Sequence, residues 1–186
     1  VMLQDSVAID AFARNDRPAL VARIEPFFEQ LQKRHSIDQL NFWTAPARIY
    51  FRAGQPNDFG ADFSKYRRTI VAANERQQRV LAIETGIAGH TDVRAIVPVV
   101  HDGKFVGVLE LASTIDVPLE RASETSGLKW AVGITRETSE RVERPANQKT
   151  DAWQKDDVFY MFSDPRTAEI MRSISFDPNA KSYTLA

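Results

Sequence analysis

The chain contains 186 residues with a mass of 21.0 kDa, and 43% of its residues are hydrophobic, 26% charged and 10% aromatic. This composition excludes a disordered chain, a collagen-like repeat and a coiled-coil rod. The formal net charge of −1 argues against a nucleic-acid-binding domain, and the absence of cysteine excludes a disulfide scaffold, an iron–sulfur site and a cysteine nucleophile.

No stretch reaches the roughly 18 apolar residues of a membrane span. The longest apolar run, Ala95–Val100, is interrupted by Pro98. The chain begins with Val1 instead of methionine and enters a helical pattern at once. We therefore interpret it as part of a longer protein whose targeting or membrane segments lie outside it.

The first 35 residues predict a long helical arm. Residues 1–14 have a helical apolar pattern, Asp16 is a candidate cap, and Pro18 suits a first helical turn. Pro26 predicts a kink in the second helix. Apolar residues recur in that helix at three- and four-residue steps: Leu20, Ile24, Phe27, Phe28 and Leu31. We expect this stripe to be buried against a sheet or in a dimer.

Residues 40–45 and 48–53 alternate in polarity and predict two strands separated by Pro46. The alternation predicts that Ile49 and Phe51 share one face of the second strand. It places three polar residues on the other face: Arg48, Tyr50 and Arg52. Turn-forming residues fill 54–60, and residues 63–78 predict a helix.

Three further strands are predicted over 80–85, 93–101 and 104–113, and Asp102-Gly103 indicates a tight hairpin between the last two. A short helix over 116–126 and a strand over 128–135 follow. Residues 137–155 predict a loop or a frayed helix, 158–162 a strand and 168–173 a helix, whereas 176–186 have no clear pattern. The fold class is α+β, with a PAS-like central antiparallel sheet, a long N-terminal helix and flanking helices.

The sequence lacks a Gly-x-Ser-x-Gly elbow, a Walker loop and a Gly-x-Gly-x-x-Gly motif. We therefore expect no enzyme activity, no catalytic residues, no cofactor and no nucleic-acid partner. The carboxylates Asp58 and Asp62 and the turn residues His90 and Asp92 are most simply solvated turn residues. An oxygen-ligand site for a hard cation is the less favoured reading, so we predict no metal ligands.

Arginines on strands are more informative, because a buried arginine needs a partner. They either pair with neighbouring carboxylates such as Glu84 and Glu110 or line a pocket that binds an anion. Nearby aromatic residues would form the walls of that pocket. The candidate ligand-binding residues are Trp43, Arg48, Tyr50, Arg52, Phe59, Glu84, Arg94 and Glu110.

Several blocks together resemble the extracytoplasmic sensor domains of the cache superfamily, which occur in bacterial methyl-accepting chemotaxis proteins and sensor kinases. The resemblance covers 40–113, and the chain departs from it at Trp43, where many relatives carry histidine, and at Ala61, where many carry an acid. The blocks that carry it are Leu40–Arg52, Pro56–Ser64, Tyr66-Arg67, Ala73-Asn74, Ile83–Gly89, Val93–Val99 and Gly103–Glu110.

The resemblance implies a helical arm over 1–35, a cache-type sensor core over 36–135 and a C-terminal extension over 136–186 that packs on the core. It implies the periplasmic ligand-binding domain of an inner-membrane receptor, membrane-anchored in the full-length protein and able to form a homodimer. The expected ligand is a small anionic molecule such as a carboxylate. The alternative is sensing through a protein partner or a metal ion.

Overall fold

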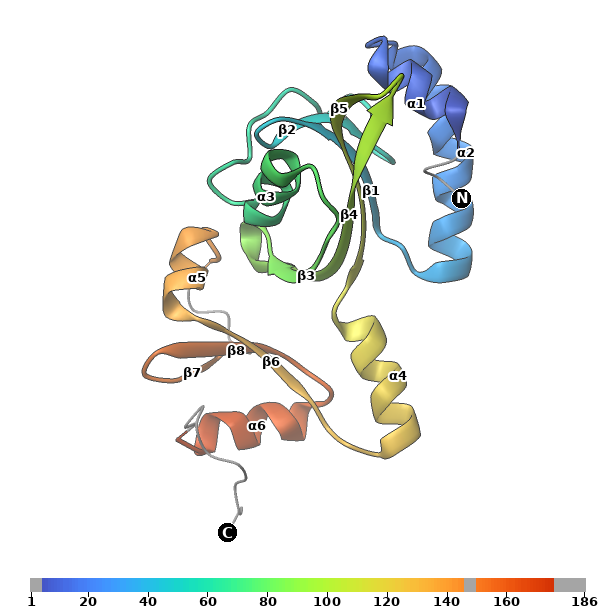
Figure 1. The fold of residues 1–186 in the computed structure, drawn as a ribbon. Coiled ribbons are helices and arrows are strands. Elements are labelled where there is room, and N and C mark those ends of the chain that lie inside the picture. Colours follow the sequence, from blue (N-terminus) through green and yellow to red (C-terminus); the bar gives the residue numbers. More distant parts are fainter. Residues whose placement is uncertain (1–4, 146–149, 176–186) are drawn as a thin grey trace. The chain divides into compact units, whose positions relative to one another are not determined.

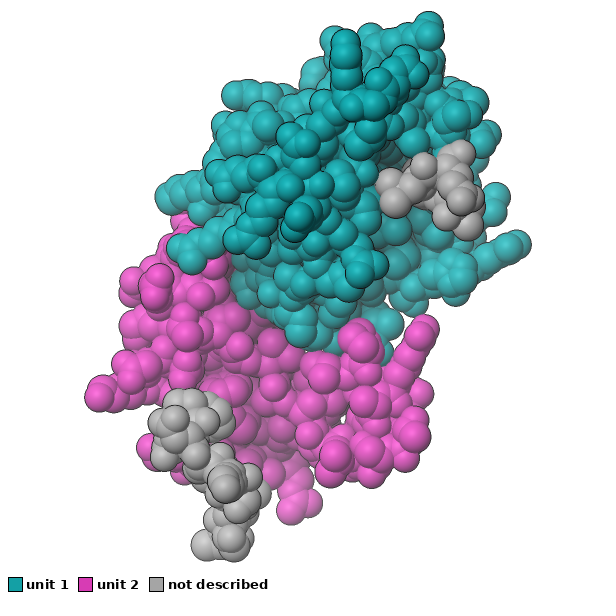
Figure 2. Space-filling view, viewed as in Figure 1, with its two compact units in different colours: residues 1–86, 90–117 teal, residues 87–89, 118–186 magenta. Residues whose placement is uncertain are grey.

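The computed structural model describes residues 5–145 and 150–175. These residues belong to two compact units (Figures 1 and 2). Unit 1 comprises residues 1–86 and 90–117, and unit 2 comprises residues 87–89 and 118–186. The division of the chain after residues 35 and 135 stays a prediction, and the predicted lack of pattern in 176–186 lies outside the described residues.

The five-stranded sheet of unit 1 is antiparallel throughout, in the order β2-β1-β5-β4-β3, which confirms the predicted fold class. Its turn between β4 and β5 is the predicted two-residue hairpin, with Asp102 and Gly103 both at positive φ (48° and 74°). The strands are β1 (Gln39–Thr44), β2 (Arg48–Arg52), β3 (Val80–Thr85), β4 (Thr91–His101) and β5 (Lys104–Thr114).

Helices α1 (Ser6–Ala13) and α2 (Arg17–His35) cover one face of this sheet (Figure 1). Asp5 and Asp16 cap their N-termini through their side chains, and Pro26 lies within the continuous helix α2. The predicted stripe is buried within the chain, since Leu20 and Ile24 are 0% exposed and pack with Phe42 and other residues of the sheet. The stripe therefore needs no dimer to cover it.

Helix α3 (Arg68–Arg76) lies on the opposite face of the sheet (Figure 1). A smaller apolar cluster forms beneath it from Ile70 and Ala73 of the helix and from strand residues of that face: Trp43, Ile49, Ile96 and Val108. At Gly107 a Cβ would lie 2.3 Å from the Trp43 carbonyl oxygen, so β1 and β5 approach closely only with glycine there.

The predicted alternation in β2 is wrong, because the β1–β2 pairing contains a bulge. Phe42 pairs with Phe51 and Trp43 pairs with Ile49, so Tyr50 is the extra residue. Tyr50 and Phe51 both pack in the cluster beneath α1 and α2, whereas Ile49 lies beneath α3. Arg48, Tyr50 and Arg52 therefore do not form one row on one face.

Unit 2 contains a three-stranded antiparallel sheet in the order β6-β8-β7. The stretch 137–155, predicted to be a loop or a frayed helix, contains most of the short helix α5 and the two-residue strand β7. Within it, Arg144 and Asp151 form a buried ion pair of 2.7 Å. The elements are η2 (Ile87–Gly89), α4 (Asp116–Ser126), β6 (Ala131–Thr135), α5 (Arg136–Arg141), β7 (Ala152–Trp153), β8 (Asp157–Phe162) and α6 (Pro165–Ser173), with α4 beginning at the end of unit 1.

None of the helices in the described part of the chain combines the length and the hydrophobicity that crossing a bilayer requires.

We predict that α2 contributes to the stability of unit 1 through its buried face. Leu20→Ala or Ile24→Ala should lower the free energy of unfolding by about 2–5 kcal/mol, because each leaves a cavity against the sheet. Gln32→Ala, at an exposed position of the same helix, should change it by less than about 0.5 kcal/mol. Urea denaturation followed by circular dichroism measures both. Equal effects at buried and exposed positions would contradict the packing of α2 on the sheet.

Candidate functional site

Five ionisable side chains in the described part of unit 1 are at least nine-tenths buried, and we call them the charge cluster. Their exposed fractions run from 0% for Glu110 to 9% for Glu84. Burying charge is unfavourable unless each group is paired and hydrogen-bonded, so such a concentration requires an explanation. The cluster consists of Arg67, Glu84, Asp92, Arg94 and Glu110.

The sheet brings these residues together on its α3 face, beside the apolar cluster beneath that helix. Side chains alternate along each strand, so Asp92 and Arg94 of β4 lie on the same face as Ile96. Glu110 lies directly opposite Asn41 of β1, and Glu84 directly opposite Asp92. Arg67 belongs to no strand and reaches the cluster from the residue that precedes α3.

Glu110 is the most extensively bonded residue of the cluster. Its Oε1 accepts a hydrogen bond from Arg94 (2.8 Å) and another from Arg67. Its Oε2 accepts hydrogen bonds from the Trp43 indole N–H (2.9 Å) and from the Asn41 amide (3.1 Å). Burial raises the pKa of Glu110, but the two guanidiniums outweigh burial and hold this pKa below its usual value. Glu110 is therefore a buried, ionised carboxylate.

Arg94 connects Glu110 to Asp92. One terminal nitrogen, Nη1, donates to Glu110, and the other, Nη2, donates to Asp92 Oδ2 at 2.5 Å. Gly86 makes room for this guanidinium, because a Cβ at that position would lie 3.2 Å from Nη2. Of the two roles considered for arginines on strands, Arg94 therefore takes the first, because it pairs with the protein's own carboxylates.

Arg67 connects Glu110 to Glu84, to which its Nε donates at 3.1 Å. The backbone N–H and the hydroxyl of Thr69 also donate to Glu84, at 3.0 and 2.6 Å. Burial lowers the pKa of Arg67, but Glu110 and Glu84 raise it by more. The guanidinium lies 5.0 Å from the centre of the Trp43 ring, in position for a cation–π contact.

Asp92 is the carboxylate with the least compensation. Burial raises the pKa of Asp92 above its usual value, and Arg94 and a hydrogen bond from Gln39 offset only part of that effect. Its Oδ2 accepts hydrogen bonds from Gln39 (2.9 Å) and Arg94, while Oδ1 has no partner among the described residues.

Two further buried atoms near Asp92 have no hydrogen-bond partner in the described structure: Asn41 Oδ1 and Arg94 Nε. Arg94 Nε lies 3.8 Å from the Glu84 carboxylate, which is beyond hydrogen-bonding distance. The Gln39 side chain connects Asp92 and Asn41, since it donates a hydrogen bond to Asp92 and accepts one from Asn41 at 3.5 Å. The cluster and the adjacent Asn41 thus have two unused acceptors and one unused donor, and the cluster itself contains three carboxylates and two guanidiniums.

Four of the eight predicted site residues meet at this cluster: Trp43, Glu84, Arg94 and Glu110. The sequence did not indicate Arg67 or Asn41 as site residues. The expectation that Asp92 is a solvated turn residue is wrong, because Asp92 lies on β4 and is 1% exposed. A signal existed for Asp92 and Asn41, because Asp92 and Arg94 are two residues apart on one strand, as are Asn41 and Trp43. Arg67 had no periodic signal, since it lies outside a regular element.

The other four predicted residues lie elsewhere in unit 1. Arg48 and Arg52 pair with the turn carboxylates Asp62 (3.8 Å) and Asp58 (2.6 Å). Tyr50 packs against Phe12 on the helix-covered face, with ring centres 4.9 Å apart. Phe59 is 53% exposed, and the Arg17 guanidinium lies over it, 3.4 Å from the centre of the Phe59 ring. Whether any of these residues contacts a ligand stays a prediction.

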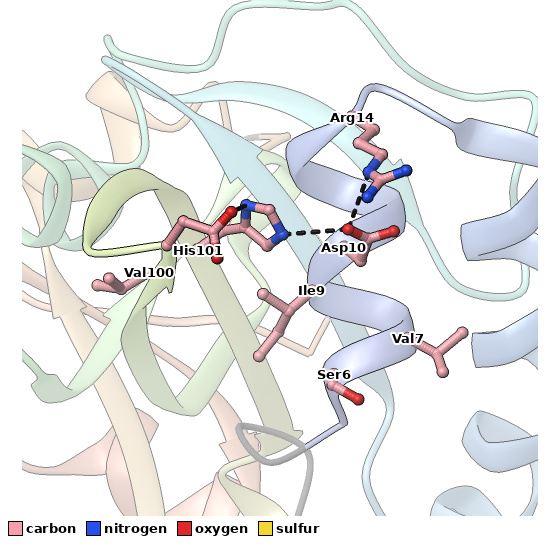
Figure 3. Close-up of a pocket in the computed structure, with 8 residues that line it drawn as sticks. Ser6, Val7, Ile9, Asp10, Arg14, Val100 and His101 are labelled. Atoms are coloured by element: carbon pink, nitrogen blue, oxygen red, sulfur yellow. Dashed lines mark hydrogen bonds and ion pairs between the residues drawn. The ribbon is translucent and has the colours of Figure 1, made fainter.

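A surface groove of about 630 Å³ lies between α1 and the β4–β5 hairpin (Figure 3). In it the His101 ring points towards α1, with Nε2 3.1 Å from Asp10 Oδ1, and Arg14 bonds the same carboxylate at 2.9 Å (Figure 3). The charges of this groove are largely exposed and paired with one another. It offers weaker grounds for a binding site than the charge cluster does.

No group of three or more histidine or acidic side chains suited to a metal ion occurs among residues 5–145 and 150–175.

Comparison with known proteins gives a family match over residues 1–157, to the family described as the double sensory domain of two-component sensor kinases. No curated protein matches the sequence. Among solved structures, the chain is similar to the sensor domain of the Vibrio cholerae histidine kinase DctB, with a TM-score of 0.56 and 13% identity. That similarity covers 89% of this chain and 57% of the solved DctB sensor domain.

The chain is also similar to the ligand-binding domain of the Pseudomonas fluorescens chemoreceptor CtaA, solved with L-serine. The TM-score is 0.50 at 16% identity, over 73% of this chain and 59% of CtaA. An extracellular ligand binding receptor from Desulfohalobium retbaense gives a TM-score of 0.49 at 15% identity, over 84% of this chain and 37% of that receptor. The chain thus spans less than two thirds of the length of each of these proteins.

We predict that Glu110 stabilises the fold as an ionised group. Glu110→Gln should lower the free energy of unfolding at neutral pH by about 3–5 kcal/mol, because Arg67 and Arg94 each lose a buried ion pair with Glu110. The folded-state pKa is depressed, so this contribution is complete above the usual value of 4.5 and is lost as pH falls through the folded pKa. Urea denaturation of both proteins across that range measures the difference. A pH-independent difference would contradict an ionised Glu110.

We predict the opposite pH dependence for Asp92. Its folded-state pKa is raised, so its contribution to stability is present below the usual value of 3.8 and is lost as pH rises through the folded pKa. The stability advantage of the wild type over Asp92→Asn should therefore shrink as pH rises from the usual value of 3.8 through the folded-state pKa. Urea denaturation at matched pH values gives this difference, in which the other acids cancel. An advantage that grew with pH would show that pairing with Arg94 outweighs burial.

Proposed function

Because the chain belongs to the family of double sensory domains of two-component sensor kinases, we propose that its charge cluster binds the small molecule to which a receptor responds. In this proposal the chain is the periplasmic part of a membrane-anchored sensor kinase or chemoreceptor. The chain is a cache-type sensor domain, and its similarity to DctB and CtaA supports this fold.

The observation that carries the proposal is the incomplete bonding of a deeply buried charge cluster. Apolar residues of similar volume would stabilise a fold as well as a buried ion network does, so stability alone does not account for five ionisable groups here. Buried polar atoms without a partner are uncommon in folded proteins, and this cluster and the adjacent Asn41 together have three of them among the described residues. A bound molecule would supply the missing partners.

Residues of the cluster alternate along the strands with residues that pack beneath α1 and α2. Trp43 and Glu110 lie on the α3 face, while their sequence neighbours Phe42 and Leu109 belong to the helix-covered core. A displacement of β1 or β5 at the cluster would therefore also move the adjacent residues of these strands, which pack against α1 and α2. We propose that ligand occupancy is passed from the sheet to the helices in this way.

The expected anionic ligand loses its main support, because the arginine expected to bind it already has partners. Both terminal nitrogens of Arg94 donate to carboxylates of the chain, and a ligand carboxylate would compete with Asp92 and Glu110 for them. A small polar molecule remains the proposed ligand, in agreement with L-serine in CtaA. Homodimerisation also stays a proposal, and the buried face of α2 gives it no support.

We predict that a thermal-shift screen of organic acids, amino acids and amines will identify a ligand. A compound at about 100 times its dissociation constant should stabilise the protein by about 2.7 kcal/mol. Arg67→Lys and Glu84→Gln should weaken its binding by more than about tenfold, because each breaks the cluster. Arg76→Ala, at an exposed position of α3, is the matched control and should bind normally.

Circular dichroism of each variant separates lost binding from lost folding. Native affinity in folded Arg67→Lys and Glu84→Gln would place the ligand outside the cluster and reject the proposed site.

A further inference from the structure

The charge cluster contains three carboxylates and two guanidiniums, and its carboxylates form ion pairs with Arg67 and Arg94. We infer that the ligand group received at this cluster is a protonated amine, held by Asp92 and Asn41. The inference rests on the proposed function, since it assumes that the cluster is the ligand site.

Apart from Arg94 Nε, the charged donors that the structure describes in this cluster bond the protein's own acids. Arg67 donates to Glu84 and Glu110, and Arg94 donates to Glu110 and Asp92. An added carboxylate would bring a fourth negative charge into a region that is almost fully buried. Like charges at short range in a poorly hydrated site oppose one another strongly, so an anion is disfavoured.

The acceptors that remain unused suit a donor group. Asp92 Oδ1 and Asn41 Oδ1 are buried without hydrogen-bond partners, on residues that are 1% and 2% exposed. Gln39 bonds both side chains, to Asp92 at 2.9 Å and to Asn41 at 3.5 Å, so the two residues flank one side chain. A protonated amine carries up to three N–H donors and no acceptor, which matches two acceptors beside an excess carboxylate.

Asp92 is the carboxylate of the cluster that a protonated amine would stabilise most. Burial raises its pKa because the charged form lacks full compensation, and an ammonium group beside it would provide that compensation. Such a partner would convert the least compensated acid of the cluster into one half of a buried ion pair. Asp92 is therefore the residue that sets the preference for a cation, while Asn41 contributes a neutral acceptor.

Isothermal titration calorimetry with three probes tests the inference: putrescine, which carries only amines, succinate, which carries only carboxylates, and L-serine, which carries one group of each kind. We expect putrescine or L-serine to bind and succinate not to bind. Asp92→Asn should weaken amine binding by at least about tenfold, and Asp92→Glu, which keeps the charge, should weaken it less. The matched control is Glu75→Gln, which removes an exposed carboxylate of α3 and should bind as the wild type does.

Each outcome separates the inference from the proposed function. Binding of succinate alone, lost in Arg67→Lys, would keep the cluster as the site and overturn the amine. Amine binding unchanged in Asp92→Asn would overturn the role of Asp92, and failure of all three probes would overturn the amine inference. If Asp92→Asn does not fold, Asn41→Ala tests the inference in its place. It removes the second acceptor and should also weaken amine binding. Native affinity in that variant would reject the inference.

Discussion

Compensation of buried charge is the constraint on which unit 1 depends. Glu110 is fully buried and must keep four donors around it, and these come from β1, β4 and the residue before α3. The strand order β2-β1-β5-β4-β3 places β5 between β1 and β4, so its central carboxylate can be reached from both sides. The register of three strands is thereby linked to one side chain, because a slip by one residue would turn its partners to the other face.

The two faces of this sheet perform different tasks with the same strands. One face is apolar and carries α1 and α2, as a packed core requires. The other is divided between the apolar cluster beneath α3 and the charge cluster. Trp43 belongs to both parts of that face, since its ring packs with Phe63 while its indole N–H bonds Glu110. A histidine, which the resemblance favours at this position, could also offer a ring N–H, so the substitution preserves a donor.

Local patterns predicted the elements of unit 1 well, because periodicity and turn chemistry are local properties. The helices to His35, the five strands and the Asp102-Gly103 hairpin follow from such patterns. The bulge at Tyr50 could not be predicted, since it is a property of the pairing between β1 and β2. The same reason explains the site. Trp43, Glu84, Arg94 and Glu110 were candidates individually, but strand pairing is needed to place Asp92 beside Glu84, and Arg67 joins them from outside any strand. The two-residue strand β7 is too short to produce a periodic signal.

The shared acceptor at Glu110 has a consequence for how this family can diverge. Arg67, Arg94, Asn41 and Trp43 all donate to one carboxylate, so replacing any one of them changes the environment of the other three. Effects of substitutions that share a partner are not additive. Lineages that acquire a new ligand preference here must therefore change several of these positions together, and the positions should covary among homologues while the surrounding core varies independently.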